Sequence, residues 1–216
     1  KARGRGECVP YARYGETVEG VAAAIEALRP RLEAGLDRSG LQAALPPGAA
    51  RNALDCAFWD LEAKATGRSA AELAGLPPLK PLVTAYTISI GTPEEMARAA
   101  EREAQRPLLK VKLGRDGDPA RIAAVRRAAP GATLIVDANE GWDERHLEAN
   151  LAACAEAGVT LVEQPLPDGR DGALARIARP IAVCADESAH ARDSLAALTG
   201  RYAAVNVKLD KAGGLT

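Results

Sequence analysis

The sequence predicts an α/β protein in which an incomplete (β/α) barrel follows a smaller, helix-rich section. Short runs rich in Val, Ile, Leu and Ala alternate with helical patterns over the last two thirds of the chain. This alternation is typical of parallel βαβ units, whose strands are buried on both faces. Charged side chains also recur at the carboxyl ends of these runs, once per strand-and-helix unit. We therefore expect these charged groups to meet on one rim of a barrel.

The opening section is expected to form a domain of its own. Its first stretch, GRGECVPYARYGET, has the pattern of a strand that runs into a loop, and apolar residues at helical spacing follow it. Helices are predicted over residues 18–36, 48–66 and 67–75. The proline-marked stretch GLPPLKPL then interrupts the helical pattern. We predict domains at residues 1–80 and 81–216.

Six strands are predicted in the second domain. They lie in the runs VTAYTISI, LLKVKL, TLIVDA, TLVEQP, IAVCADE and AAVNVKLD. Six strands are too few to close an eight-stranded barrel. The predicted barrel is therefore incomplete within this chain.

Composition excludes several classes of function. The chain has 216 residues, of which 47% are hydrophobic and 26% charged, with a formal net charge of -1. It contains no basic run, no apolar stretch of transmembrane length and no secretory signal pattern. We therefore expect no nucleic-acid or membrane partner, and a cytoplasmic location by default.

Two lysines lie one residue apart in the strand LLKVKL. Alternate residues of a strand project to the same face, so Lys110 and Lys112 are expected to point together. One interpretation is an edge strand whose lysines prevent aggregation. The other is a functional site that needs both positive charges.

Three acidic residues favour the second interpretation. Asp137, Glu163 and Asp186 stand at the ends of three consecutive predicted strands, and with Lys112 and Lys208 they recur every 22 to 26 residues. One such aspartate could be a helix N-cap or a turn residue. Three carboxylates on one rim repel one another unless a cation joins them. Oxygen ligands without His or Cys favour Mg²⁺, with Mn²⁺ as an alternative.

Lysines flank these acids along the chain. Lys112 precedes the acids and Lys208 follows them, so in a closed barrel the two would face each other across the metal. A nearby positive charge lowers the pKa of an ammonium group, and either lysine could then act as a base. Lys110 is expected to lower the pKa of Lys112 and to bind a carboxylate of the substrate.

The order of these motifs resembles a known family. The series K-x-K, D-x-N, E-Q-P, A-D-E-S and N-x-K, followed by KAGG, resembles the muconate-lactonizing branch of the enolase superfamily, also called the mandelate racemase/muconate lactonizing branch. Within this branch, GRGECVPYARYGET and AYTISIGTPEEMA are most similar to dipeptide epimerases of the L-Ala-D/L-Glu type. The resemblance implies a modified TIM barrel behind an α+β capping domain, of which residues 1–80 would be a part.

The resemblance also implies roles for individual residues. Asp137, Glu163 and Asp186 would bind Mg²⁺, and Lys112 and Lys208 would be the acid/base pair on opposite faces of the substrate α-carbon. The implied reaction is a two-base 1,1-proton transfer through an enediolate. Residues with lesser implied roles are Asn139, supporting the metal site; Thr87, in contact with substrate; and Lys211, as a competitor for the role of Lys208.

Several alternatives stay open at this level. The branch uses the same acids and lysines in muconate cycloisomerases, o-succinylbenzoate synthases and N-acylamino acid racemases. The family pattern has two further capping-domain strands before Lys1 and two further barrel strands after Thr216, so an inactive fragment is an alternative of another class. A small-molecule carboxylate is the expected partner, and homo-oligomers are common in the branch.

Overall fold

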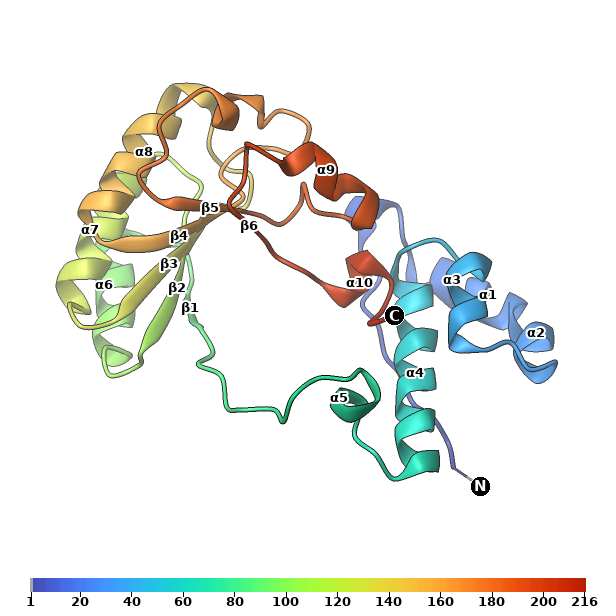
Figure 1. The fold of residues 1–216 in the computed structure, drawn as a ribbon. Helices are drawn as coiled ribbons and strands as arrows, with labels where there is room; N and C mark the ends of the chain where they lie inside the picture. The colour runs from blue at the N-terminus through green and yellow to red at the C-terminus, as the bar shows by residue number, and fades with distance from the viewer. Residues whose placement is uncertain (1) are drawn as a thin grey trace. The chain divides into compact units, whose positions relative to one another are not determined.

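The computed structural model describes residues 2–216, and the chain divides into two compact units (Figure 1). The first unit contains the chain up to Pro81 together with His190–Arg192 and Val207–Thr216. The second contains Leu82–Ala189 and Asp193–Asn206. The C-terminal residues therefore pack with the N-terminal helices in the first unit. The division into domains at residues 1–80 and 81–216 stays a prediction.

All the regular secondary structure in the described residues of the first unit is helical. Its elements are η1 (Ala12–Tyr14), α1 (Val18–Ala27), α2 (Arg29–Glu33), α3 (Arg38–Ala44), α4 (Ala49–Thr66), α5 (Ala70–Leu73) and α10 (Leu209–Ala212). Side-chain caps fix several of the starts: Thr17 accepts from the backbone N–H of Gly20 at α1, and Asp37 accepts from Gly40 at α3. The helix α3 falls in a stretch for which no helix was predicted.

The prediction of one helix over residues 18–36 is wrong. The structure has two helices, α1 and α2, separated at Leu28. Pro30 explains the break, because a proline has no N–H to give to the preceding turn and disfavours helical geometry in the residue before it. The apolar spacing continues through the break, so periodicity alone did not reveal it.

The predicted strand at the start of the chain is also absent. Residues 2–11 form neither helix nor strand, because no second strand lies beside them in the described part of the chain. The segment instead lies against α4. A Cβ atom added to Gly6 would be 2.0 Å from the carbonyl oxygen of Ala53, so only glycine permits this approach.

The second unit is built on one parallel sheet. Its strands are β1 (Tyr86–Ile88), β2 (Leu108–Lys112), β3 (Thr133–Asp137), β4 (Val159–Glu163), β5 (Ala182–Ala185) and β6 (Ala204–Val205). They are hydrogen-bonded in sequence order, and every neighbouring pair is parallel. Right-handed crossovers in sequential order place the connections on one face of a sheet, which is the topology of a barrel wall.

Long helices connect only the first four strands. These helices are α6 (Pro93–Arg102), α7 (Asp118–Ala128) and α8 (Glu144–Glu156). The later connections hold only short pieces, namely η2 (Gly172–Ala175), η3 (Arg192–Ser194) and α9 (Leu195–Leu198). The expectation of a helix after every strand is therefore wrong for β4, because Gly169, Gly172 and Pro180 interrupt the segment that follows it.

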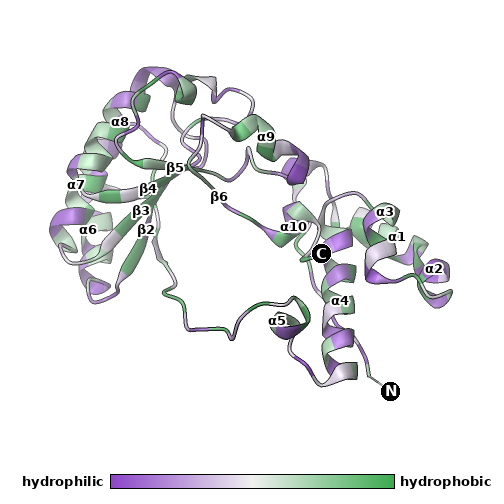
Figure 2. Cartoon of the chain, in the orientation of Figure 1, coloured by the Kyte–Doolittle hydropathy of each residue, from purple (hydrophilic) through white to green (hydrophobic). Residues whose placement is uncertain are grey.

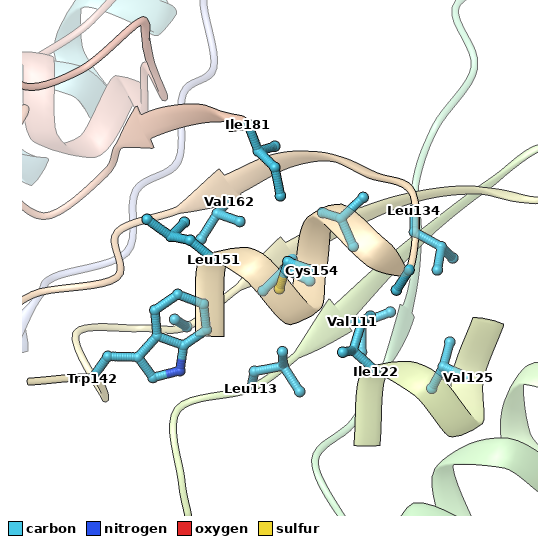
Figure 3. Close-up of a cluster of buried hydrophobic side chains, with 14 of the residues drawn as sticks. Val111, Leu113, Ile122, Val125, Leu134, Trp142, Leu151, Cys154, Val162 and Ile181 are labelled. Carbon is cyan, nitrogen blue, oxygen red and sulfur yellow. The ribbon is translucent and has the colours of Figure 1, made fainter. Parts of the chain in front are cut away.

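The core of the second unit lies between the sheet and these helices. Figure 3 shows Val111, Leu134 and Val162 of the strands packed with residues of α7 and α8 such as Ile122 and Leu151. Figure 2 shows strands that are largely hydrophobic, whereas α6 to α8 carry both hydrophilic and hydrophobic residues, as expected for helices with one buried side. Among residues 2–216, no helix has the length and apolar character needed to cross a membrane.

Candidate active site

Strand register places Lys112, Asp137 and Glu163 in one row. Lys112 pairs with Asp137 across β2 and β3, and Asp137 pairs with Glu163 across β3 and β4. Each is the last residue of its strand, so the row lies at the carboxyl edge of the sheet. The buried Val111 and Val136 belong to the helix-covered core. Because neighbouring positions on a strand point to opposite faces, the charged row projects to the other face.

Two ammonium groups neutralise two buried carboxylates in this row. Lys110 Nζ lies 2.8 Å from Asp137 Oδ2 and 2.6 Å from Glu163 Oε2, and Lys112 Nζ lies 2.7 Å from Asp137 Oδ2. The acid side chains are only 2% and 6% exposed. Burial acts to lower the pKa of Lys110, but its hydrogen bonds to Asp137 and Glu163 outweigh burial and raise the pKa above its ordinary value.

Two asparagines fix the outer edges of the cluster. Lys112 Nζ donates to Asn139 Oδ1 at 2.6 Å, and the Asn139 backbone N–H donates to Asp137 Oδ1 at 3.0 Å. On the other side, Asn206 Nδ2 donates to Glu163 Oε1 at 2.8 Å. The motifs D-x-N and N-x-K each contribute one of these amides. No role of its own was predicted for Asn206, although it is the first residue of the N-x-K motif.

Gln164 links β4 to the loop that carries Asp186, and no role was predicted for it from the sequence. Its side chain is fully buried, and its Oε1 accepts from the backbone N–H groups of Asp186 at 2.9 Å and Ser188 at 3.1 Å. Its backbone has φ of 36°, in the left-handed region that a residue with a side chain rarely adopts. Such a conformation costs about 1–3 kcal/mol and persists only where the surroundings impose it. Only the E-Q-P motif marked this position in the sequence.

A buried polar network binds the side-chain amide nitrogen of Gln164. Its Nε2 donates to Ser188 Oγ at 2.8 Å and to Tyr202 Oη at 3.0 Å. Asp171 Oδ2 accepts from Ser188 Oγ at 2.8 Å and from Tyr202 Oη at 2.6 Å, and Arg201 pairs with the other oxygen of Asp171. Burial, followed by the hydrogen bond to Asp171, raises the pKa of Tyr202. Tyr202 therefore stays a neutral donor in this network.

We expect Gln164→Met to destabilise the protein. Methionine has a similar length but cannot accept from Asp186 and Ser188, whose buried N–H groups would lose their partner. Buried unsatisfied groups cost about 1–3 kcal/mol each, so we expect a loss of roughly 2–4 kcal/mol in the free energy of unfolding. Chemical denaturation measures it. Gln105→Met at an exposed position is the matched control, and an equally small effect of both changes would contradict this role of Gln164.

The structure places the remaining predicted residues as follows. Thr87 lies on β1, pairs in register with Lys110 and is exposed. Lys208 and Lys211 belong to the first unit, where Lys208 is the N-cap residue of α10 and Lys211 is buried inside that helix, 2% exposed. The contact of Thr87 with substrate and the pairing of Lys208 with Lys112 stay predictions.

The acids of the second unit fit a hard divalent cation. Lys110 Nζ shows that one positive group can reach oxygens of both Asp137 and Glu163. Within residues 2–216, no three Asp, Glu, His or Cys side chains are gathered closely enough to surround a metal. Asp186 is buried two residues beyond the β5 position that pairs with Glu163. Beside it, Glu187 Oε2 is buried without a hydrogen-bond partner, and burial and the charge of Asp186 raise the pKa of Glu187. The carboxylates of Asp137, Glu163 and Asp186 would offer a cation only oxygen ligands, which suits Mg²⁺ or Mn²⁺.

Two family models match the chain. Residues 94–216 match the model described as enolase C-terminal domain-like. Residues 2–75 match the mandelate racemase/muconate lactonizing enzyme N-terminal domain. Together these two matches include almost the whole chain.

Individual proteins agree with this match. The chain is 51% identical to an L-Ala-D/L-Glu epimerase of Escherichia coli K12, over 99% of this chain and 67% of that protein. It is 46% identical to an N-acetyl-D-glutamate racemase of a Pseudoalteromonas species, over 99% of this chain and 68% of that protein. The chain thus spans about two thirds of the length of these relatives.

Solved structures show the same fold. An enolase family member from Agrobacterium tumefaciens with homology to dipeptide epimerases, solved with sodium and L-Ala-L-Glu, is 56% identical with a TM-score of 0.95, over 98% of this chain and 65% of that one. A dipeptide epimerase of Cytophaga hutchinsonii, complexed with Mg and D-Ala-L-Val, is 27% identical with a TM-score of 0.87, over 98% of this chain and 62% of that one.

The sequential parallel sheet, with lysines and acids at its carboxyl edge, defines a protein of the (β/α)-barrel class whose site lies on the rim of the barrel. With both domain models matched, the chain belongs to the mandelate racemase/muconate lactonizing enzyme branch of the enolase superfamily. The resemblance and the fold class expected from sequence are both confirmed.

Proposed function

We propose that the protein carrying this chain is a Mg²⁺-dependent epimerase of dipeptides of the L-Ala-D/L-Glu type. The observation that carries the proposal is the row in which Lys112 contacts Asp137 beside Glu163 at the carboxyl edge of the sheet. This row supplies a base next to acids that can hold a cation, which is what removal of a proton next to a carboxylate requires. Relatives named as epimerases, one of them solved with a dipeptide, support the substrate class.

Asp137, Glu163 and Asp186 would hold the metal. When bound, Mg²⁺ supplies positive charge that offsets the negative charge growing on the substrate carboxylate as the α-proton leaves. Lys110 contacts Asp137 and Glu163 in this structure and would bind the substrate carboxylate. Asn139 and Asn206 would keep the acid oxygens oriented.

The two lysines would move the protons. Lys112 Nζ would accept the α-proton from one face, while Lys208 Nζ would deliver a proton to the opposite face. In the reverse direction the roles exchange. A single base would return the proton to the face from which it came, so inversion of the centre needs two. Asn139 Oδ1 and Asp137 Oδ2 hold Lys112 Nζ in place for this step.

A second candidate function comes from the relative named N-acetyl-D-glutamate racemase. N-Acetylglutamate and Ala-Glu are both glutamates acylated on nitrogen, and the alanyl group is larger than the acetyl group by one carbon and an amino group. The same lysines and acids would serve either substrate.

A cytoplasmic location and a homo-oligomeric state stay predictions.

The proposal predicts exchange and inversion of the glutamate α-proton. In deuterated water with Mg²⁺, the protein should exchange that proton of L-Ala-L-Glu and of L-Ala-D-Glu, as followed by NMR, and should interconvert the two. N-Acetyl-L-glutamate and N-acetyl-D-glutamate are the comparison substrates, and faster turnover of them would favour the second candidate. Removal of the metal with EDTA should stop exchange, and added Mg²⁺ should restore it. Full turnover by the metal-free protein would overturn the proposal, and so would the absence of exchange with all four substrates.

A further inference from the structure

Three side chains of α4 bind the segment that follows Lys208. Asp55 is fully buried, and its Oδ2 accepts from the backbone N–H groups of Leu215 at 2.7 Å and Thr216 at 3.0 Å. Arg51 donates to the carbonyl oxygens of Ala212 at 2.7 Å and Gly213 at 3.1 Å. Asn52 Nδ2 donates to Asp210 Oδ1 at 2.7 Å. These contacts join positions about 160 residues apart in the sequence, all within the first unit.

This segment includes a helix too short to be stable alone. The helix α10 (Leu209–Ala212) has four residues, and a single helical turn fixes more backbone freedom than its hydrogen bonds repay. Lys208 is its N-cap residue, and the Lys208 carbonyl accepts from the N–H groups of Lys211 at 3.0 Å and Ala212 at 2.9 Å. The backbone of Lys208 is therefore part of the first turn of α10, and contacts that hold α10 also hold this backbone.

The loop after α10 is shaped to fit Asp55. Gly214 has φ of 117°, and a Cβ atom added there would lie 2.5 Å from both Cβ and Oδ2 of Asp55. Glycine is thus needed at this position for the loop to reach the carboxylate. Arg51 satisfies carbonyl groups at the end of α10 that the helix itself leaves open.

We infer that Arg51, Asn52 and Asp55 are positioning residues for the base Lys208. Contacts within the first unit would thereby orient Lys208, whereas Lys112 is held separately by Asp137 and Asn139. This inference rests on the proposed function. Because different residues hold the two bases, substitutions in α4 should slow proton transfer at one face of the substrate and not at the other.

The test measures α-proton exchange of the two epimers of Ala-Glu separately, in the protein that carries this chain. In Asp55→Asn, the amide oxygen can accept from the two backbone N–H groups only if its NH2 group faces Gln42 Nε2, a donor that now bonds to Asp55 Oδ1. We expect exchange of the epimer that depends on Lys208 to fall on the order of 100-fold, the cost typical of a misplaced catalytic group. Exchange of the epimer that depends on Lys112 should fall far less, and Mg²⁺ affinity should stay unchanged. Lys208→Met identifies which epimer is which.

Asp60→Asn is the matched control. Asp60 lies on the same helix but pairs with Lys64 and the backbone of Arg5, so its loss should leave exchange of both epimers unchanged. Should Asp55→Asn fail to give folded protein, Arg51→Met is measured with the same expectation. An equal fall for both epimers, or an unfolding midpoint that drops while exchange is kept, would show a purely structural role and overturn the inference. A wild-type protein that exchanges neither epimer would instead overturn the proposed function, before any variant is compared.

Discussion

Replacement of Glu163 by glutamine should abolish Mg²⁺-dependent epimerisation while leaving the fold intact. Glutamine has nearly the same shape but lacks the charge that would hold the metal, and its amide could present N–H groups to Lys110 Nζ, itself a donor. Metal stabilisation of developing charge is worth several kcal/mol, so we expect turnover to fall roughly 100- to 1000-fold or more.

The fold should tolerate this change, because Asp137 still pairs with Lys110 and the glutamine oxygen can still accept from Asn206. Isothermal titration with Mg²⁺ should show weakened binding, whereas the thermal unfolding midpoint should move little. Glu148→Gln, an exposed position on α8, is the matched control and should change neither quantity. Wild-type Mg²⁺ affinity and turnover in Glu163→Gln would exclude Glu163 as a ligand.

Replacement of either catalytic lysine should stop α-proton transfer at one face of the substrate. Lys112→Met should lose α-proton exchange with one epimer of Ala-Glu and Lys208→Met with the other, and both variants should lose epimerisation. Methionine keeps the apolar part of the side chain, so packing is preserved. A positioned general base is worth about 100- to 10,000-fold, which sets the expected loss of exchange at the affected face.

Lys211→Met distinguishes the two candidates in the N-x-K region. Lys211 is buried within α10, and its replacement is expected to change exchange less than replacement of Lys208 does. Lys80→Met, at an exposed position outside both units' helices and strands, serves as the control. Near wild-type epimerisation by Lys112→Met and Lys208→Met would mean that neither lysine transfers the α-proton, and the site would need a different base.

Local periodicity was enough to determine much of this chain. The alternation of the run LLKVKL put Val111 in the core and Lys112 on the opposite face, because side chains of a strand alternate whatever the neighbours are. The repeat of about 25 residues per unit likewise placed Asp137 and Glu163 in the same row as Lys112. Strand positions and the charged row could therefore be predicted from the sequence.

Tertiary packing decided the partners of these side chains. That Lys110 lowers the pKa of Lys112 and binds a substrate carboxylate stays a prediction, whereas its contacts with Asp137 and Glu163 were not predicted. These contacts arise because two buried carboxylates need positive charge nearby. The structural roles of Gln164 and Asp55 were likewise not predicted. Their hydrogen bonds reach backbone groups 22 to 161 residues away, and no local pattern encodes which loop will arrive there. A strand or helix can be predicted from the periodicity of its own residues. The role of a buried amide or carboxylate depends instead on which distant backbone N–H groups become buried beside it when the chain folds.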